Sequence, residues 1–356
     1  MPVSQDQVLE ALRGVVDPDL HKDIVDLGFV KNVRIAGGDV EFTIELTTPA
    51  CPVRDQMKTQ AEAAVAALDG VTTARATMTA QVRARPTLGG QALPGVRNIV
   101  AVGAGKGGVG KTTAAVNIAV ALARDGARVG LMDGDVYGPN VPQMLGLDQQ
   151  PGLTDDGKLV PPETHGVKIV SMGMLVPPDQ ALIWRGPMLH SAVQQFLRDV
   201  KWGELDYLVV DLPPGTGDVS LSMAQSVPVS GAVLVTTPQG VSVSDVRKAV
   251  MMFRQLKVPV LGVIENMSHF VCGHCGERTE IFGRGGGRKM AEEMGLPFLG
   301  DVPMETAVRS GGDEGHPIAL VEGESAAARA FRDAARQVAA QISIQAARSL
   351  NVVEAS

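Results

Sequence analysis

Residues 101–113 read AVGAGKGGVGKTT, and this stretch decides the fold. Its second part, from Gly105 to Thr112, matches the phosphate-loop pattern G-x-x-x-x-G-K-[ST]. An apolar strand-like run precedes the loop and a helix-forming run follows it, which is the context that the motif requires. Backbone amides of such a loop point at phosphate oxygens, and the helix N-terminus adds partial positive charge. The residues expected to bind the nucleotide are Gly105, Lys106, Gly107, Gly108, Val109, Gly110, Lys111, Thr112 and Thr113.

Three acidic residues follow other apolar runs of the same segment. Asp211 ends YLVVD and precedes a Pro-Pro-Gly turn, whereas Asp133 and Asp135 follow VGLM. In an open α/β sheet the ligand lies at the carboxyl ends of the strands, so these carboxylates should converge on the phosphates. Lys111 is expected to reach the β- and γ-phosphates of ATP. Thr112, Asp133 and Asp211 are expected to hold Mg²⁺. The alternative for Asp135 is that it only caps a turn.

The pattern around the loop predicts an α/β fold. Six short apolar runs, the first NIVAVGA and the last VPVLGVIEN, alternate with helical segments from residue 98 onward. This alternation is typical of a mostly parallel sheet covered by helices on both faces. We assign residues 98–350 to this domain, with residues 351–356 as a frayed tail. The proline- and glycine-rich residues 83–97 read as a linker.

Residues 1–82 predict a small α+β domain. Ser4 can cap a helix, with Gln7 at the capping-box position. A hairpin around a Gly-Gly turn follows, then a helix with Pro52 in its first turn, then a strand.

Composition narrows the function classes. The formal net charge of −7 disfavours nucleic acid as a partner, since duplex binding needs many cations facing phosphates. We see no signal peptide and no apolar run long enough to cross a membrane. Three cysteines fit a reducing compartment better than a disulfide framework. We therefore expect a cytoplasmic protein without a membrane partner.

Lys106 is a second lysine in the loop, five residues before Lys111. It lies on the outer bend, so its side chain should point away from its own nucleotide. It could reach the nucleotide of a facing subunit, as an arginine finger does, or it could simply be solvated.

Cys272 and Cys275 form a C-x-x-C pair directly after an apolar run. Such a bend suits one metal ion or one edge of a cluster, but a tetrahedral zinc or a [4Fe–4S] cluster needs four ligands. One chain offers two local thiolates, and a symmetric homodimer would offer four. A redox-active pair, zinc held with His269 or His274, and inert thiols remain open alternatives, as does a [2Fe–2S] cluster.

KGGVGKTT, DGD, DLPPGTGD and ENMSHFVCGHCGE together resemble the deviant Walker A ATPases, and most closely the Mrp/ApbC iron–sulfur carriers. This resemblance implies that Lys106 contacts ATP across a dimer interface. It implies that Asp135 lies on a first switch that positions the attacking water, and that Asp211 begins a second switch. It also implies that Asn266 contacts the adenine.

The N-terminal residues resemble the SufT/PaaD-like domain of iron–sulfur assembly, with Cys51 in its TTPACP motif. A thiolate just ahead of a helix start should have a lowered pKa. Cys51 is then either a hand-off ligand or a half-buried loop cysteine.

The sequence therefore predicts an ATP hydrolase with slow turnover that carries a [4Fe–4S] cluster between two subunits and passes it to apo-proteins. The expected partners are a second copy of the chain, apo iron–sulfur proteins and cluster-assembly proteins. A MinD/ParA-like positioning ATPase and a zinc-binding regulatory nucleotide switch are the alternatives.

Overall fold

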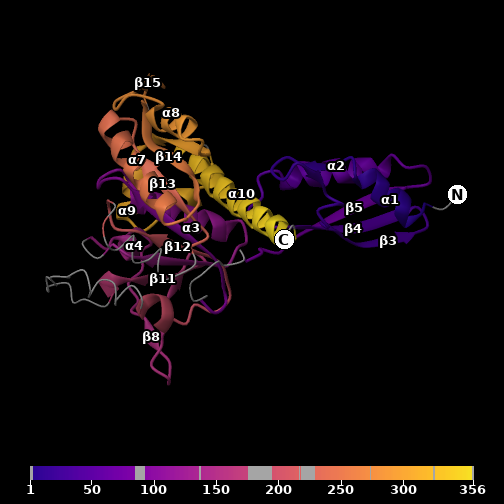
Figure 1. The fold of residues 1–356 in the computed structure, drawn as a ribbon, viewed down its shortest axis with the longest axis horizontal. Coiled ribbons are helices and arrows are strands. Elements are labelled where there is room, and N and C mark those ends of the chain that lie inside the picture. The colour runs from indigo at the N-terminus through magenta and orange to yellow at the C-terminus, as the bar shows by residue number, and fades with distance from the viewer. Residues whose placement is uncertain are drawn as a thin grey trace. The chain divides into compact units, whose positions relative to one another are not determined.

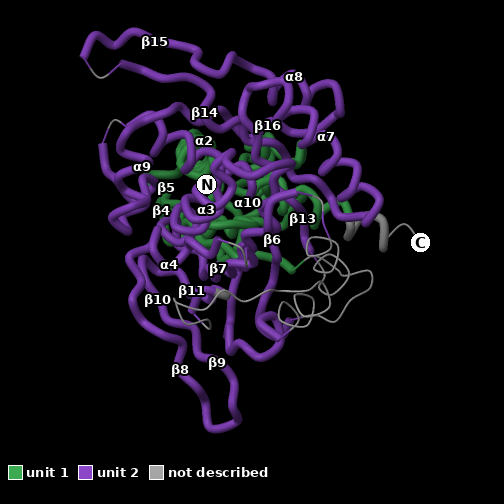
Figure 2. The backbone as a smooth tube through the Cα atoms, turned by 90° about the vertical axis from the view of Figure 1, so that its left-hand side faces the viewer, with its two compact units in different colours: residues 1–84, 339–356 green, residues 85–338 purple. Residues whose placement is uncertain are grey.

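The computed structural model describes residues 3–84, 93–135, 138–174, 195–215, 217, 229–272, 274–323 and 325–354. The chain divides into two compact units, which Figure 2 shows in different colours. Residues 1–84 and 339–356 form one unit, and residues 85–338 form the other. The predicted linker falls largely on residues 85–92, which lie outside the described residues.

The N-terminal unit is a three-stranded sheet packed against two helices. Ser4 caps α1 (Gln5–Leu12) in a capping box with Gln7, as the sequence predicts. The hairpin and the third strand form a sheet in the order β3-β4-β5, in which β3 and β4 are antiparallel and β4 and β5 are parallel. Its regular elements are β1 (Val16–Asp17), β2 (Lys22–Asp23), β3 (Val30–Ala36), β4 (Asp39–Leu46), α2 (Arg54–Ala66) and β5 (Thr73–Ala80).

Three boundaries differ from the sequence prediction. The predicted linker, residues 83–97, ends earlier than expected because a strand begins at Val96. Helix α2 begins at Arg54 with Val53 as its N-cap, so Pro52 lies in the turn before the helix and not in its first turn. The C-terminal helix α10 runs over Ala326–Glu354, so residues 351–354 continue the helix that we expected to fray.

The second unit is built on a nine-stranded sheet (Figure 1). Its strand order is β10-β11-β7-β12-β6-β13-β14-β15, and β16 also pairs with β14. All pairings are parallel except those of β10 and β15, which confirms the predicted fold class. The strands are β6 (Val96–Ala104), β7 (Val129–Asp133), β10 (Glu163–Thr164), β11 (Val167–Ser171), β12 (Leu205–Asp211), β13 (Gly231–Thr236), β14 (Val260–Val271), β15 (Arg278–Thr279) and β16 (Phe298–Met304).

Helices cover the sheet because its strands are apolar on both faces. Side chains of one face, such as Leu208 and Leu234, pack with α7 (Gly240–Gln255) and α8 (Gly286–Glu293) in one continuous core. Helix α3 (Lys111–Arg124) packs on β6, β7 and β12. The remaining elements are α4 (Val141–Met144), β8 (Gly152–Leu153), β9 (Leu159–Val160), η1 (Met172–Met174), α9 (Thr306–Asp313) and η2 (Ile318–Leu320).

Within the described residues, none of the helices combines the length and the apolar character that crossing a bilayer requires.

Candidate functional site

The phosphate loop connects β6 to α3 in the conformation that its glycines permit. Gly108 and Gly110 have φ angles of 77° and 80°, which residues with a Cβ atom rarely adopt. A Cβ atom on Gly105 would overlap the backbone of Asp245 in α7. The loop therefore needs these glycines for its own shape before any ligand binds.

Lys111 and Asp211 form a buried ion pair at the start of α3. Lys111 Nζ lies 2.6 Å from Asp211 Oδ1, and the Thr112 hydroxyl donates to Asp211 Oδ2 at 2.7 Å. Lys111 is 6% exposed and Asp211 is fully buried. Burial raises the pKa of Asp211, although Lys111 opposes the rise. The loop, α3 and β12 thus bring together the side chains that the sequence singled out for phosphate and magnesium binding.

Asp133 is fully buried at the end of β7 and accepts three hydrogen bonds. The Asp135 backbone amide donates to Asp133 Oδ1 at 3.1 Å, while the Ser171 hydroxyl and the Val141 amide donate to Oδ2 at 2.9 and 3.3 Å. Burial, reinforced by the charge of Asp211, raises the pKa of Asp133 to about 7. Asp133 therefore holds the start of the segment that follows β7, a role that sequence reasoning missed.

Asp135 and Lys106 differ in their surroundings. Asp135 Oδ2 lies 3.7 Å from Lys111 Nζ, so Asp135 lies beside the lysine that the sequence assigns to the phosphates. Lys106 is half-buried, and within the described part of the chain it forms no hydrogen bond or ion pair. The two lysines of the loop thus differ in their partners. Lys111 forms ion pairs with Asp211 and Asp135, whereas Lys106 forms none with the described residues.

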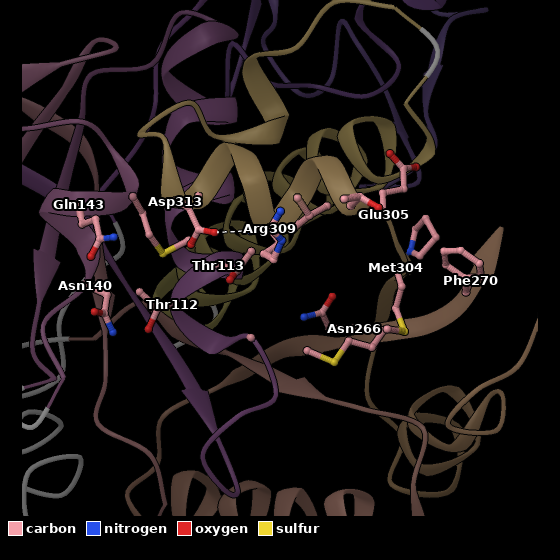
Figure 3. A pocket seen from close by; sticks show the side chains of 17 residues that line it. Thr112, Thr113, Asn140, Gln143, Asn266, Phe270, Met304, Glu305, Arg309 and Asp313 are labelled. Carbon is pink, nitrogen blue, oxygen red and sulfur yellow. Dashed lines mark hydrogen bonds and ion pairs between the residues drawn. The ribbon is translucent and has the colours of Figure 1, made fainter. Parts of the chain in front are cut away.

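A cavity of about 630 Å³ opens beside the phosphate loop (Figure 3). Asn266 lies within it, and its amide nitrogen donates to the Val109 carbonyl at 2.9 Å. Figure 3 shows Thr112, Asn140 and Gln143 on one side of the cavity and Met304 and Phe270 on the other. Most of its far wall comes from β16 and α9, where Arg309 forms an ion pair with Asp313.

Sequence reasoning missed that wall. The run FLGDVPM forms β16, but its glycine and proline disfavour a strand in the sequence. The run VPM, directly before the start of a helix, is the feature that indicates one.

Cys272 and Cys275 lie in the turn of an antiparallel hairpin formed by β14 and β15. The Cys272 amide donates to the Glu277 carbonyl at 2.9 Å, and the Gly276 amide donates back to the Cys272 carbonyl at 2.8 Å. The Cys275 and His274 amides donate to the Cys272 sulfur and lower its pKa. Cys272 is half-buried and Cys275 is exposed, so both thiols are open to a ligand.

No set of three or more His, Cys, Asp or Glu side chains suited to one metal ion occurs among the described residues. His269, a zinc ligand in one of the alternatives, is buried and turned to protein partners. Its Nδ1 accepts from Arg278 at 3.1 Å, and burial lowers its pKa. The described part of one chain therefore brings two cysteine thiols, and no third ligand, to this hairpin.

The prediction for Cys51 is wrong in its electrostatics. Burial raises the pKa of the Cys51 thiol to about 11, and the nearby charges of Asp17 and Asp19 add to the rise. The Val53 backbone hydrogen bond lowers the pKa but does not offset the burial. Because α2 begins three residues later, at Arg54, Cys51 lacks the helix N-terminus that the sequence predicts for it.

Comparisons with known proteins agree on the family. Residues 95–339 match the model of the NUBPL iron-transfer P-loop NTPases, and residues 5–76 match that of the iron–sulfur cluster assembly proteins. An iron–sulfur cluster carrier protein of Deinococcus radiodurans is 52% identical over 341 residues, which cover 96% of each chain.

Solved structures share the fold of the second unit. A nucleotide-binding protein from Archaeoglobus fulgidus, in complex with ADP, is 36% identical with a TM-score of 0.55, over 63% of this chain and 88% of that one. The cell division ATPase MinD of Pyrococcus furiosus is 24% identical with a TM-score of 0.51, over 68% of this chain and 98% of that one. At that identity the MinD likeness shows the fold alone.

Proposed function

Because the chain belongs to the family of NUBPL iron-transfer P-loop NTPases, we propose that it is an ATP-dependent iron–sulfur cluster carrier. Two copies bind one [4Fe–4S] cluster between them and pass it to apo-proteins. The name of the Deinococcus radiodurans relative, similar over nearly its whole length, supports this function. The match of residues 5–76 to cluster assembly proteins supports it independently.

The observation that carries the proposal is the pair of accessible thiols on one hairpin. Cys272 has a lowered pKa and Cys275 is exposed, and thiolates are the usual ligands of iron–sulfur clusters. A cubane cluster takes four cysteine ligands, whereas the described residues of one chain bring two together. A two-fold axis at the hairpin completes the set without a further residue type.

The nucleotide half of the function rests on the buried cluster at the start of α3. Lys111, released from Asp211, turns to the β- and γ-phosphates of ATP. The donors around that position are hydroxyl and carboxylate oxygens from Thr112, Asp211 and Asp133, which suit Mg²⁺. Magnesium, when bound, neutralises phosphate charge. Burial first, and the charge of Asp211 second, raise the pKa of Asp133, so a cation bound nearby would favour the ionised form of this carboxyl group.

Hydrolysis assigns separate tasks to Asp135 and Lys106. Asp135 faces the same side of the loop as Lys111 and orients the attacking water. Lys106 has no partner among the described residues of its own unit and reaches the triphosphate of the facing subunit. The cavity beside Asn266 takes the adenosine, because it continues from the phosphate loop and has an apolar wall with a few polar groups. With Lys106 supplied in trans, turnover requires dimerisation and is slow.

Anaerobic reconstitution with iron and sulfide tests the proposal. The wild-type protein should hold about four iron and four sulfide per two chains, and its mass should be that of a dimer. A Cys272→Ala/Cys275→Ala double variant should bind ATP normally and hold no cluster. Cys51→Ala is the matched control and should retain the cluster.

Two results would contradict the proposal. One is a double variant that still loads a cluster with an unchanged spectrum, and the other is a monomer with a complete metal centre. Metal analysis of the protein purified without oxygen separates a cluster from zinc.

A further inference from the structure

One strand connects the nucleotide site to the cysteine hairpin. Strand β14 runs over Val260–Val271, so Cys272 is the first residue after it. Asn266 in its second half donates to the phosphate-loop carbonyl of Val109. Phe270 lines the cavity and also pairs with Thr279 of β15, in the residue pair of the hairpin farthest from its turn. Asn266, beside the phosphate loop, therefore lies six residues before Cys272 and nine residues before Cys275 along the chain.

This strand is irregular between those two points. Asn266 pairs with Val302 of β16 and Phe270 pairs with Met304. Between these two pairs, β14 has three residues, Met267, Ser268 and His269. Strand β16 has only one residue there, Pro303. Proline cannot donate a ladder hydrogen bond, which favours a bulge opposite it.

Met267 adopts an unusual backbone conformation at the start of the bulge. Its φ angle is 55°, in the left-handed region. Residues with a Cβ atom disfavour this region, and β-branched residues disfavour it most. Met267 also lines the cavity together with Gly110 of the phosphate loop. A residue strained in this way persists only where its surroundings hold it, and such residues gather at switch regions.

Two hydrogen bonds connect the bulge to its neighbours. The Ser268 hydroxyl donates to the Val302 carbonyl at 3.0 Å, and Arg278 on the far hairpin strand donates to His269 Nδ1 at 3.1 Å. The bulge is therefore tied to β16 on one side and to the far strand of the hairpin on the other.

We propose that Met267 is a positioning residue that couples the nucleotide in the cavity to the geometry of Cys272 and Cys275. A bound nucleotide packs against the Met267 side chain and holds the bulge in its left-handed form. An empty cavity lets Met267 relax toward extended backbone, which shifts the residues after it along β16 and reorients the hairpin. The inference rests on the proposed function, in which Cys272 and Cys275 hold a cluster. The geometry of the cluster ligands would then depend on whether nucleotide is bound.

Alkylation of the thiols by iodoacetamide tests the coupling in the protein without a cluster. The rates at Cys272 and Cys275 are measured by peptide mass spectrometry, with the cavity empty and with it saturated by a non-hydrolysable ATP analogue and Mg²⁺. The half-buried Cys51 is the internal reference. In the wild type, the rate at each of the two thiols should change about fivefold or more between the empty and the saturated cavity. This factor is at the lower end of allosteric coupling.

Substitutions at Met267 separate backbone geometry from side-chain contact. Asparagine tolerates the left-handed region without nucleotide and lacks the side chain that the nucleotide would contact. Met267→Asn should therefore lose the nucleotide effect, with both thiols fixed near the rates of the nucleotide-bound wild type. Valine disfavours that region and glycine does not distinguish the two forms, so Met267→Val and Met267→Gly should reduce the effect below about twofold at saturating nucleotide. Lys257→Val is the matched control, because Lys257 has a φ of 57° in the turn between α7 and β14, outside the cavity lining.

The proposal is overturned if the wild-type thiols react equally with and without nucleotide, or if Met267→Val keeps the full difference. It is also overturned if Lys257→Val loses the difference to the same extent. Because no cluster is present, failure to load a cluster would refute the proposed function and leave this measurement intact.

Discussion

Lys111 Nζ lies 2.6 Å from Asp211 Oδ1 in a buried site, and Thr112 donates to the other oxygen of the same carboxylate. The pair therefore holds the start of α3 against the end of β12. Under the proposed function, the same two groups would supply a cation for the phosphates and a ligand for magnesium.

Lys111→Ala should impair both folding stability and nucleotide binding. The substitution leaves the Asp211 carboxylate buried without its partner, which costs about 3 kcal/mol when a buried ion pair is broken. Thermal unfolding and equilibrium binding of a fluorescent ATP analogue measure the two effects. Lys289→Ala, at an exposed lysine, is the control and should change neither. Normal ATP affinity in Lys111→Ala would contradict the assignment of Lys111 to the phosphates.

Lys106→Ala should impair hydrolysis far more than binding. Its side chain makes no described contact within its own unit, so the midpoint of unfolding should not change. If Lys106 acts in trans, kcat should fall by at least ~100-fold, since a comparable arginine finger contributes still more. Mixing Lys106→Ala with a variant that cannot bind nucleotide should restore part of the activity. Wild-type turnover in Lys106→Ala would remove the trans contact.

The stability of the nucleotide-free protein should depend on pH through Asp133. Its pKa rises from 3.8 to about 7 on folding, so the native state keeps a proton that the unfolded chain releases. This contribution to stability is complete below the unfolded pKa and is lost as pH rises through about 7. Relative to Asp133→Asn, the wild type should lose on the order of 3 kcal/mol between about pH 4 and pH 8. Urea unfolding at several pH values measures it, and parallel profiles of the two proteins would contradict the raised pKa.

Cys51 should be the least reactive of the three thiols. With a pKa of about 11, roughly one molecule in a thousand carries the thiolate at pH 8, whereas the pKa of Cys272 is lowered. Iodoacetamide should therefore modify Cys272 first, and the rate at Cys51 should keep rising well above pH 9. In urea the three cysteines should react alike, which controls for local sequence. Fast modification of native Cys51 would restore the hand-off role that the sequence suggested.

Local motifs carried much of the site. Gly105 to Thr112, the carboxylates after β7 and β12, and the C-x-x-C turn each depend on a few neighbouring residues, because backbone conformation and strand ends are short-range properties. The parallel sheet was also predictable, since apolar runs alternating with helices have few other ways to bury both faces.

What the sequence by itself determined was therefore the phosphate loop, its acidic neighbours, the cysteine pair and the class of fold. Only the tertiary structure decided which carboxylate meets Lys111, what Asp133 holds, how deeply Cys51 is buried and which residues close the cavity. Met304 and Arg309 lie nearly two hundred residues from Thr112 along the chain, yet line the same cavity. Burial, charge proximity and strand register arise from long-range packing, and no stretch of neighbouring residues contains them.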